Sequence, residues 1–306
     1  MPEVILHHYN SSPFSEKVRI CLGIKTLEWR AVEQPVIMPK ADLVPLTGGY
    51  RRIPVMQIGA DIYCDSHLIV RELDRRFPGK SLFPVGNEGL AIAIEQWCDK
   101  GLFQSAVVAI FGSIGDNVDP AFLKDREALS GQPFNVAAMK AMAPFALDQI
   151  RTHAALLARQ LADGRAFLAG DAPCLADAAG YYNFWFIRSF SPGLADRFGD
   201  LPGFDAWYDR VTSIGHGTRT AMTPEQALGV ARVAQPAELD ALPGDAALMG
   251  RAVTLAATDY GRDPIPGIFA GSTHFSMSVA RDVAGLGRVN VHVPRLGYSV
   301  TPVQDD

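Results

Sequence analysis

Short apolar runs and stretches of helical period alternate along the first 78 residues of the chain. Apolar runs bounded by turn residues are typical of strands, and apolar side chains three or four positions apart are typical of helices. The expected order is strand, helix, strand, loop or short helix, strand, strand and helix, at 4–8, 13–24, 29–32, 39–44, 54–58, 61–64 and 66–77. This order predicts a mixed sheet covered by helices, and pattern alone leaves a generic α/β domain of another topology as the alternative.

A different pattern follows the segment 77–84, which is rich in helix breakers and is expected to be a linker. Four long, mostly Ala-rich stretches of helical period come next, at 91–114, 135–162, 176–190 and 203–214. No convincing strand lies between them, so this part of the chain is predicted to be all helical.

The pattern changes once more near residue 220, where the expected strands lie at 251–257, 275–279, 289–293 and 298–303. In the third of these runs Val289, Val291 and Val293 point to one face, and Asn290 and His292 point to the other. The sequence therefore predicts three parts, which are an α/β domain at 1–78, a helical domain at 85–218 and a small β-rich third domain of unknown role at 220–306.

Length and composition agree with a protein of several domains that has an ordinary apolar core. The chain has 306 residues, of which 48% are hydrophobic and 20% charged. Its net charge of −5 argues against nucleic acid or anionic lipid as the main partner. No apolar run reaches the ~18 residues of a membrane span, and no signal peptide is recognised. Four scattered cysteines fit buried thiols in a reducing compartment, so we expect a cytoplasmic protein.

The helix expected at 13–24 begins with Ser12-Pro13-Phe14-Ser15, directly after a predicted strand. A helix N-terminus offers unpaired N–H groups and a positive dipole end, which lower the pKa of a nearby thiol. In thiol redox folds of this kind two cysteines occupy the places that Ser12 and Ser15 hold here, so a reactive sulfur must arrive with a ligand. A Ser12 hydroxyl that donates to the thiolate contributes about 1–3 kcal/mol. The alternative is an ordinary N-cap with Pro13 at the first helical position.

Two further short motifs indicate a peptide-like ligand at the same edge of the sheet. Ile53-Pro54 precedes a predicted strand and is a candidate cis peptide, which would leave the Ile53 N–H and C=O free to pair with an extended peptide. Asp65-Ser66 begins the next predicted helix, where a carboxylate and a hydroxyl suit the ammonium and the carboxylate of a ligand. Capping is the alternative role for this pair. Each motif alone is ordinary, whereas their joint order and spacing are not.

Taken together, these motifs resemble the glutathione-binding domain of cytosolic glutathione transferases. The matching residues are Ser12-Pro13-Phe14-Ser15 with Lys17-Val18-Arg19, then Arg52-Ile53-Pro54-Val55, then Asp65-Ser66 eleven residues after the proline. The serine-type branches, such as the tau and zeta classes, are the most similar. Because the helical segment resembles the second domain of that family, the resemblance covers residues 1 to about 215. It implies a thioredoxin-like N-terminal domain, an all-α domain of GST type and a β-rich extension that ordinary members lack.

The resemblance implies a role for each matching residue. Ser12 is expected to stabilise the glutathione thiolate, and Ile53, which precedes Pro54, is expected to pair with the cysteinyl backbone. Asp65 and Ser66 are expected to hold the γ-glutamyl end of glutathione.

The same resemblance implies residues for the glycyl end of glutathione and for the electrophile. Arg52 and Lys40 are expected to approach the glycyl carboxylate, with a solvated surface charge as the alternative for Lys40. A wall for a hydrophobic electrophile is expected from aromatic side chains, with plain core packing as the alternative. These side chains are Tyr9, Phe14, Trp97, Phe103 and Phe111.

The chain also departs from the family pattern. Asp65 stands where the family usually has Glu, and Asp reaches less far. The capping box of the helical domain reads Cys174-Leu175-Ala176-Asp177, in which cysteine is a poor cap acceptor. Residues past about 220 have no counterpart in ordinary members. Five side chains there are candidates for a site or, alternatively, for core and surface: Tyr260, Arg262, His292, Arg295 and Tyr298.

His7 and His8 end the first predicted strand near Ser12, and one is expected to be buried and the other exposed, with a role as a base as the alternative. No metal-binding motif such as H-E-x-x-H or a paired C-x-x-C occurs, so no metal is implied.

The expected function is therefore a glutathione transferase of detoxification that activates the glutathione thiol as a thiolate for attack on a small hydrophobic electrophile. The expected assembly is a cytoplasmic homodimer with no nucleic-acid or membrane partner. Two alternatives stay open, namely a non-catalytic protein that binds glutathione or another ligand, and a glutathione-dependent isomerase.

Overall fold

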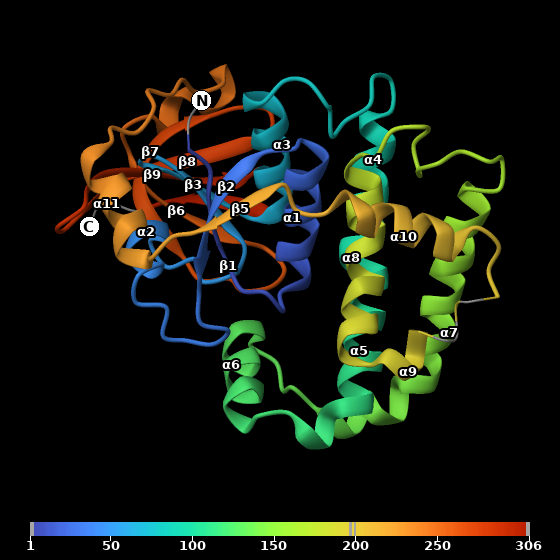
Figure 1. Ribbon diagram of the computed structural model, residues 1–306. Helices are drawn as coiled ribbons and strands as arrows, with labels where there is room; N and C mark the ends of the chain where they lie inside the picture. The colour runs from blue at the N-terminus through green and yellow to red at the C-terminus, as the bar shows by residue number, and fades with distance from the viewer. Residues whose placement is uncertain (1–2, 196–197, 199, 304–306) are drawn as a thin grey trace.

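The computed structural model describes residues 3–195, 198 and 200–303. A half built around a sheet, to which both ends of the chain contribute, lies beside a helical half formed by the middle of the chain (Figure 1). No helix within the described ranges is long and apolar enough to cross a membrane.

The N-terminal segment forms the predicted mixed α/β unit. Its elements are β1 (Ile5–His8), α1 (Pro13–Ile24), β2 (Glu28–Glu33), α2 (Val44–Thr47), β3 (Val55–Ile58), β4 (Asp61–Cys64) and α3 (Ser66–Arg76). β1 pairs parallel with β2 and antiparallel with β3, which pairs antiparallel with β4. The order of elements and the bounds of α1 and β4 confirm the prediction. α1 starts at Pro13 because Ser12 caps it and proline needs no N–H partner in the first turn.

The middle of the chain is all helical, as predicted. Its helices are α4 (Glu88–Trp97), α5 (Phe103–Ile114), α6 (Pro120–Ser130), α7 (Val136–Gln160), α8 (Leu175–Phe190), α9 (Pro192–Ala195) and α10 (Phe204–Ile214). A π-helical turn at Cys98–Leu102 joins α4 to α5 within the stretch that was predicted as one helix. The sequence does not predict α6, because Leu129 is its single buried residue and no apolar stripe marks the helix.

Asp177 anchors the start of α8. One of its carboxylate oxygens accepts from the N–H of Cys174 at 3.0 Å, which is the half of the capping box that the sequence retains. The other accepts from the N–H of Leu168 at 2.8 Å and from Nε1 of Trp207 at 2.9 Å. Cys174 is thus a weak cap acceptor, but Asp177 of the same capping box accepts two further hydrogen bonds.

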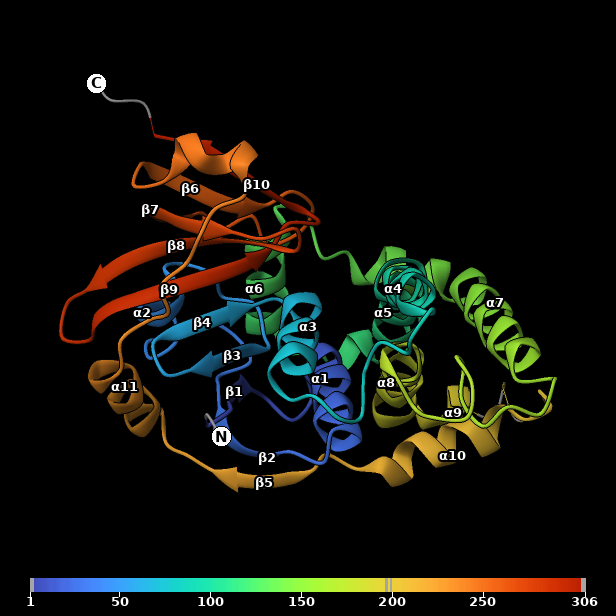
Figure 2. The same ribbon diagram turned by 90° about the horizontal axis from the view of Figure 1, so that it is seen from above.

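The C-terminal extension is rich in strands, as predicted, but its strands do not form a sheet of their own. It comprises β5 (Thr218–Ala221), α11 (Pro224–Val233), the 3-10 segment Pro243–Leu248, β6 (Ala252–Ala257), β7 (Ile265–Ser272), β8 (Ser276–Val283), β9 (Gly287–Pro294) and β10 (Tyr298–Pro302). All ten strands belong to one sheet in the order β10-β6-β7-β8-β9-β4-β3-β1-β2-β5 (Figure 2).

The sequence predicted a separate third domain, and this prediction is corrected here. The strands of the extension enlarge the N-terminal sheet. β9 pairs parallel with β4, and β5 pairs parallel with β2. Both outer strands of the N-terminal unit have backbone groups that need partners, and the extension provides a strand for each edge. The residue bounds of the three predicted parts stay a prediction.

The two larger of three apolar clusters in the described residues lie on opposite faces of the sheet, and the small third one joins Ile5 and Val32 to Ala227 of α11. The first joins α1 and α3 to the helical half of the molecule. The second joins α2, β3 and β4 to the extension, and its buried members include Leu46, Val55, Ile62, Phe269 and Val291. Successive residues of a strand point to opposite faces, so Tyr63 packs into the first core while Ile62 packs into the second.

His7 and His8 are both buried, which corrects the expectation that one of them is exposed. The His7 face of β1 is covered because the Gln57 side chain binds Nε2 of His7 at 2.9 Å and donates to the carbonyl of Ala227 in α11 at 2.9 Å. Burial lowers the pKa of His7 to about 4, and burial next to Arg19 lowers the pKa of His8 to about 3. Both rings are therefore neutral parts of the core at neutral pH.

Candidate functional site

Ser12 lies at the N-terminus of α1 and is 2% exposed. Its Oγ accepts a hydrogen bond from the N–H of Ser15 at 3.2 Å. A serine hydroxyl has one hydrogen to donate besides the lone pairs with which it accepts. The capping bond uses a lone pair and not the hydrogen of Ser12, so the O–H can donate to the Tyr9 phenol beside it or turn to a thiolate at the helix N-terminus, and the two roles considered for this residue are compatible.

Tyr9 and a group of cations surround Ser12. The Tyr9 phenol is within hydrogen-bond reach of Ser12 and Arg126, and these contacts oppose the rise in the pKa of Tyr9 that burial causes. Lys40 lies 5.8 Å from the Tyr9 ring centroid, and its ammonium donates to the carbonyl of Pro35. Burial, together with the positive charges of Arg126 and Arg51, lowers the pKa of Lys40 to about 8. Lys40 is thus a buried residue beside Tyr9 and not a solvated surface charge.

The Ile53–Pro54 peptide bond is cis, as the sequence suggested, and Pro54 directly precedes β3. A second cis bond, Met38–Pro39, lies next to Lys40. Among the described residues neither the N–H nor the C=O of Ile53 has a hydrogen-bond partner. Its main chain is therefore available to an extended peptide.

Asp65 and Ser66 begin α3. Asp65 has φ +77°, and its Oδ1 accepts from the N–H of His67 at 3.1 Å. Its Oδ2 accepts from the Tyr298 hydroxyl at 3.1 Å and lies 3.5 Å from Nη2 of Arg52. The structure therefore places Arg52 at the Asp65 end of the site, and it is Arg51 whose charge acts on Lys40.

The aromatic residues expected to wall an electrophile site fall into separate clusters. Phe14 of α1 packs against Phe103 and Tyr182, with ring centroids 4.7 Å and 5.3 Å apart. Trp97 instead packs against His153 of α7 at 4.9 Å.

Phe111 packs against Phe122 and Phe134, between α5 and α6, with centroids 5.6 Å and 5.1 Å apart. The structure thus brings Tyr9, Phe14 and Phe103 toward the start of α1, and it places Trp97 and Phe111 in other packing clusters.

Residues from α6 and from the extension border the site, and sequence reasoning missed those from α6. From α6, Arg126 donates to the carbonyl of Val36 at 2.8 Å, and Asp125 binds Arg51 at 3.2 Å. No motif marks these residues as functional. From the extension comes Tyr298, which the sequence marked as one of five candidates without separating it from the others.

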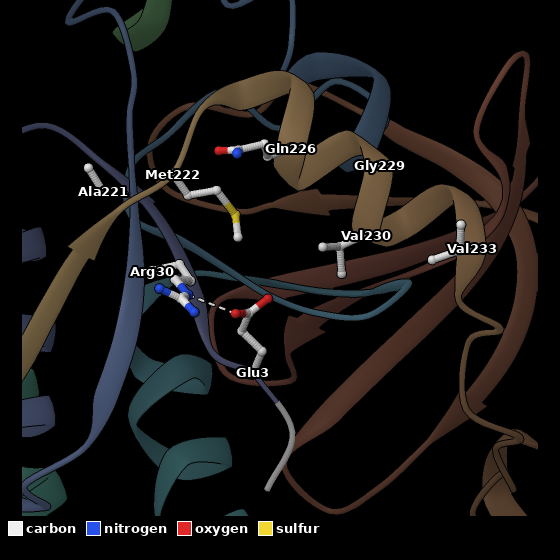
Figure 3. A pocket seen from close by; sticks show the side chains of 8 residues that line it. All are labelled: Glu3, Arg30, Ala221, Met222, Gln226, Gly229, Val230 and Val233. Atoms are coloured by element: carbon white, nitrogen blue, oxygen red, sulfur yellow. Dashed lines mark hydrogen bonds and ion pairs between the residues drawn. The ribbon is translucent and has the colours of Figure 1, made fainter.

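Two pockets of the described surface are lined by residues other than those of the candidate site. One is a hollow between β2, β5 and α11, where Glu3 and Arg30 form an exposed ion pair beside Met222 and Val230 (Figure 3). The other is an apolar groove between α5 and α7. The candidate site is bordered by Arg126 and Asp125 of α6 and by Tyr298 of the extension.

A buried charge cluster ties α1 to the helical half. Nζ of Lys17 binds Glu95 at 2.9 Å and Asp99 at 2.5 Å, and Nδ1 of His67 binds Glu95 at 2.6 Å. Lys17 and His67 hold the pKa of Glu95 below its usual range against the effect of burial, whereas burial raises the pKa of Asp99 to about 6. The cluster fixes the orientation of α1, and with it the position of Ser12.

Within the described part of the chain, no three His, Cys, Asp or Glu side chains gather as metal ligands. All four cysteines are unpaired and buried. Burial raises the pKa of each thiol, so none of them is a ready nucleophile.

Comparison with known proteins shows which family the chain is similar to. Residues 6–81 match the family model of the glutathione S-transferase N-terminal domain, and residues 106–216 match a domain of unknown function (DUF7962). A probable glutathione S-transferase of Nicotiana tabacum is 25% identical over 213 residues, which are 68% of this chain and 83% of that protein.

Solved structures separate the common fold from the extension. A GST-like protein from Pseudomonas syringae is 34% identical with a TM-score of 0.77, and the match covers 98% of this chain and 100% of that one. A tau class glutathione S-transferase from mango, Mangifera indica, is 19% identical with a TM-score of 0.53, and the match covers 69% of this chain and 89% of that one. The extension therefore has a counterpart in the bacterial structure, whereas the plant structure matches about two thirds of this chain.

Proposed function

The chain belongs to the glutathione S-transferase family, and from that premise we propose that it is a serine-type glutathione transferase. It binds glutathione along the open main chain of Ile53, keeps the thiol anionic at Ser12 and directs it at a small hydrophobic electrophile. The observation that carries the proposal is that Ser12 caps α1 through its oxygen and still has its hydrogen to donate.

The chemistry follows from the helix N-terminus. Its unpaired N–H groups and dipole favour the thiolate over the thiol, and the Ser12 O–H adds a charge-assisted hydrogen bond of about 1–3 kcal/mol. That bond corresponds to a fall of about one to two units in the thiol pKa. The thiol proton passes to solvent and the thiolate attacks the electrophile: a carbon–sulfur bond forms while either the bond to an anionic leaving group or the π bond of an activated alkene breaks, and no residue of the chain is covalently changed.

The remaining groups orient the tripeptide. Asp65 faces the ligand's ammonium, and Ser66 with the start of α3 faces the γ-glutamyl carboxylate. Lys40 lies on the opposite side of Ser12, beside Tyr9, in a position that suits the glycyl carboxylate. Tyr9, Phe14 and Phe103 form the wall against which the electrophile packs.

The proposal includes a cytoplasmic homodimer. Unpaired, buried cysteines suit a reducing compartment. The apolar groove between α5 and α7 exposes Met142 by 49% and Phe145 by 59%, and a second copy of the chain would cover it. Light scattering on the purified protein should give twice the chain mass, and Phe145→Asp should reduce it to one chain. A wild-type protein of one chain mass contradicts this part of the proposal.

Titration of bound glutathione tests the thiolate directly. Thiolate absorbance of the complex should appear near neutral pH, well below its range for free glutathione. An unshifted thiol in a tight complex favours the non-catalytic binding protein. Turnover of a cis-enone diacid with glutathione that is not consumed favours the isomerase.

Ser12→Ala should lower kcat/KM for conjugation by about 10–100-fold, which corresponds to the loss of one hydrogen bond to a charged group. Glutathione binding and the fold should remain, although the lost cap lowers stability by about 1 kcal/mol. Ser12→Thr keeps both the cap and the donor and should retain most activity, and Ser11→Ala is the matched control on the neighbouring serine. Equal turnover in wild type and Ser12→Ala would mean that the hydroxyl is a cap alone.

A further inference from the structure

The extension reaches the Asp65 end of the site through one side chain, Tyr298 of β10. Its hydroxyl donates to Oδ2 of Asp65 at 3.1 Å and accepts from Nη2 of Arg52. The Arg52 guanidinium also lies 5.0 Å from the ring centroid of Tyr50 and 5.6 Å from that of Tyr298. A residue from the last strand of the chain thus links an acid and a base from the N-terminal unit.

The loop between β6 and β7 covers the same cluster. Gly261 in this loop has φ +59°, and a Cβ added there would lie 3.0 Å from Cδ of Arg52. In the next turn of the loop, Asp263 lies 3.5 Å from Nε of Arg51. The close approach of the Gly261 backbone keeps Arg52 extended toward Asp65.

The hydrogen-bond donors and acceptors around Asp65 show why the Tyr298 phenol matters. Oδ1 of Asp65 is used by the N–H of His67, so Oδ2 is the oxygen left for a ligand. Tyr298 donates to one lone pair of Oδ2 at 3.1 Å, and the Arg52 donor on the second is long, at 3.5 Å, so a ligand's ammonium can take the place of Arg52 there. Because burial raises the pKa of Tyr298 well above its usual value, the phenol stays protonated and its role as donor is fixed.

We propose that Tyr298 is a positioning residue for the γ-glutamyl end of glutathione, so that the extension completes the ligand site. The proposal rests on the proposed function. Tyr298 holds Oδ2 of Asp65 toward the ligand's ammonium and Arg52 toward the ligand's α-carboxylate. Asp65 is one methylene shorter than glutamate, and the phenol from β10 supplies the constraint that the short side chain lacks. The site therefore selects thiols that carry a free α-amino acid group.

The test compares wild type with Tyr298→Phe, which removes the hydroxyl and keeps the ring over Arg52. Calorimetry should show glutathione binding weakened by about 5–20-fold, as expected for one hydrogen bond to a charged group. KM for glutathione should rise by the same factor while kcat at saturation stays within about twofold. Cysteinylglycine, which lacks the γ-glutamyl group, should bind both proteins equally.

The controls separate this inference from the proposed function. Tyr181→Phe removes a hydroxyl in the helical half, where it accepts from Thr212 at 3.3 Å, and should leave glutathione binding unchanged. In a double-mutant cycle, Asp65→Asn should make the effect of Tyr298→Phe largely disappear. Absence of glutathione binding in wild type would overturn the proposed function. Tight wild-type binding with the same KM in Tyr298→Phe would overturn the role of Tyr298 alone.

Discussion

Ser12 and Asp65 each cap a helix with one atom and have a second polar atom that takes no part in the cap. The oxygen of Ser12 accepts from Ser15, which leaves its hydrogen, and Oδ1 of Asp65 accepts from His67, which leaves Oδ2. A cap and a ligand group draw on different lone pairs and hydrogens of the same side chain. A capping bond at the start of a helix therefore holds the side chain in a precise position. It is no argument against a second role of the same side chain in binding a ligand.

Lys40 should make glutathione binding depend on pH. Its pKa is lowered to about 8 in the free protein, so it loses its charge as the pH rises through that value. If its ammonium binds the glycyl carboxylate, affinity for S-methylglutathione, which has no titrating thiol, should fall by about tenfold from neutral pH to about pH 9. Calorimetry at several pH values measures this.

Lys40→Arg is the matched variant because arginine stays charged throughout this range. It should bind S-methylglutathione with a flatter pH profile than wild type, and the α-amino group of the ligand titrates equally in both experiments. Identical profiles for the two proteins would remove Lys40 from the glycyl site.

The local motifs could be predicted from the sequence, because each depends on neighbours within a few positions. Ser12 with Pro13, the cis bond at Ile53 and Asp65 with Ser66 all lie where the sequence places them. The partner of Asp65 could not be predicted, because Tyr298 stands 233 positions further along the chain and reaches it through sheet pairing. Nor does sequence spacing show which of Arg51 and Arg52 turns toward Asp65.

At the scale of elements, a buried polar chain joins the extension to the N-terminal sheet. Nδ1 of His292 in β9 binds Oγ of Ser278 in β8 at 2.8 Å, and its Nε2 binds Oδ1 of Asp61 in β4 at 2.9 Å. Asp61 also accepts from the N–H of Ala237 at 3.0 Å. Although this is the order of a serine–histidine–acid relay, Ser278 is 2% exposed and its chain serves to connect three strands.

Asp61→Ala should lower the free energy of unfolding by about 2–3 kcal/mol, because it leaves the imidazole of His292 and the N–H of Ala237 buried without a partner. Urea denaturation measures this. Asp282→Ala, on the exposed end of β8, is the matched control and should change the free energy by less than about 0.5 kcal/mol.

Since hydrogen bonding and charge from His292 lower the pKa of Asp61 against burial, the contribution of Asp61 should be present at neutral pH and disappear as the pH falls through its folded pKa. Equal stabilities of the two variants would contradict a structural role for this chain.

The buried charge cluster of Lys17, Glu95, Asp99 and His67 should show the opposite pH dependence. Burial raises the pKa of Asp99 from 3.8 to about 6, so the folded protein binds this proton more tightly than the unfolded chain. Its contribution to stability is present below about pH 4 and is lost as the pH rises through about 6. Hydrogen bonding to Glu95 raises the pKa of His67 against burial, which gives the same sign.

Asp99→Asn removes this titration. From about pH 4 to pH 7 the variant should gain about 1–2 kcal/mol in free energy of unfolding relative to wild type. Denaturant titrations at several pH values measure the difference, in which the titrations of other groups cancel. The exposed Asp205→Asn is the control. If the difference in free energy of unfolding between Asp99→Asn and wild type did not change with pH, the proton would be bound by a group other than Asp99.

Elements with a strong apolar period were predictable, and those shaped by tertiary pairing were not. α1 and the paired strands β3 and β4 follow from local pattern. β7 was missed because Pro266, Gly267 and Gly271 interrupt its apolar alternation, and its pairing with β6 and β8 compensates for them. β5 was missed because all four of its residues are exposed, and only its backbone pairing with β2 makes it a strand.

At the scale of the whole molecule, the extension and the N-terminal unit share one core. Val55 and Ile62 of the N-terminal strands pack in the same buried cluster as Phe269 and Val291 of the extension. Apolar side chains on that face of β3 and β4 are covered by α2, by neighbouring loop residues such as Tyr50, and by the extension. The hydrophobic pattern of the sequence changes near residue 220 because the type of secondary structure changes there. It does not mark a boundary between two separate apolar cores.

A shared core predicts that damage in the extension opens the N-terminal strands. Phe269 of β7 is 1% exposed, and Phe269→Ala should cost about 3–5 kcal/mol because it leaves a cavity in the common cluster. Amide hydrogen exchange of β3 and β4 should accelerate by the same factor as that of β8 and β9, since one cooperative unit opens as a whole. Phe275→Ala, at a side chain 51% exposed in the neighbouring turn, should leave both pairs of strands nearly as protected as in wild type. Faster exchange confined to β6–β9 would show that the extension unfolds alone, and its contact with Asp65 would then be an addition to an independent domain and no part of its core.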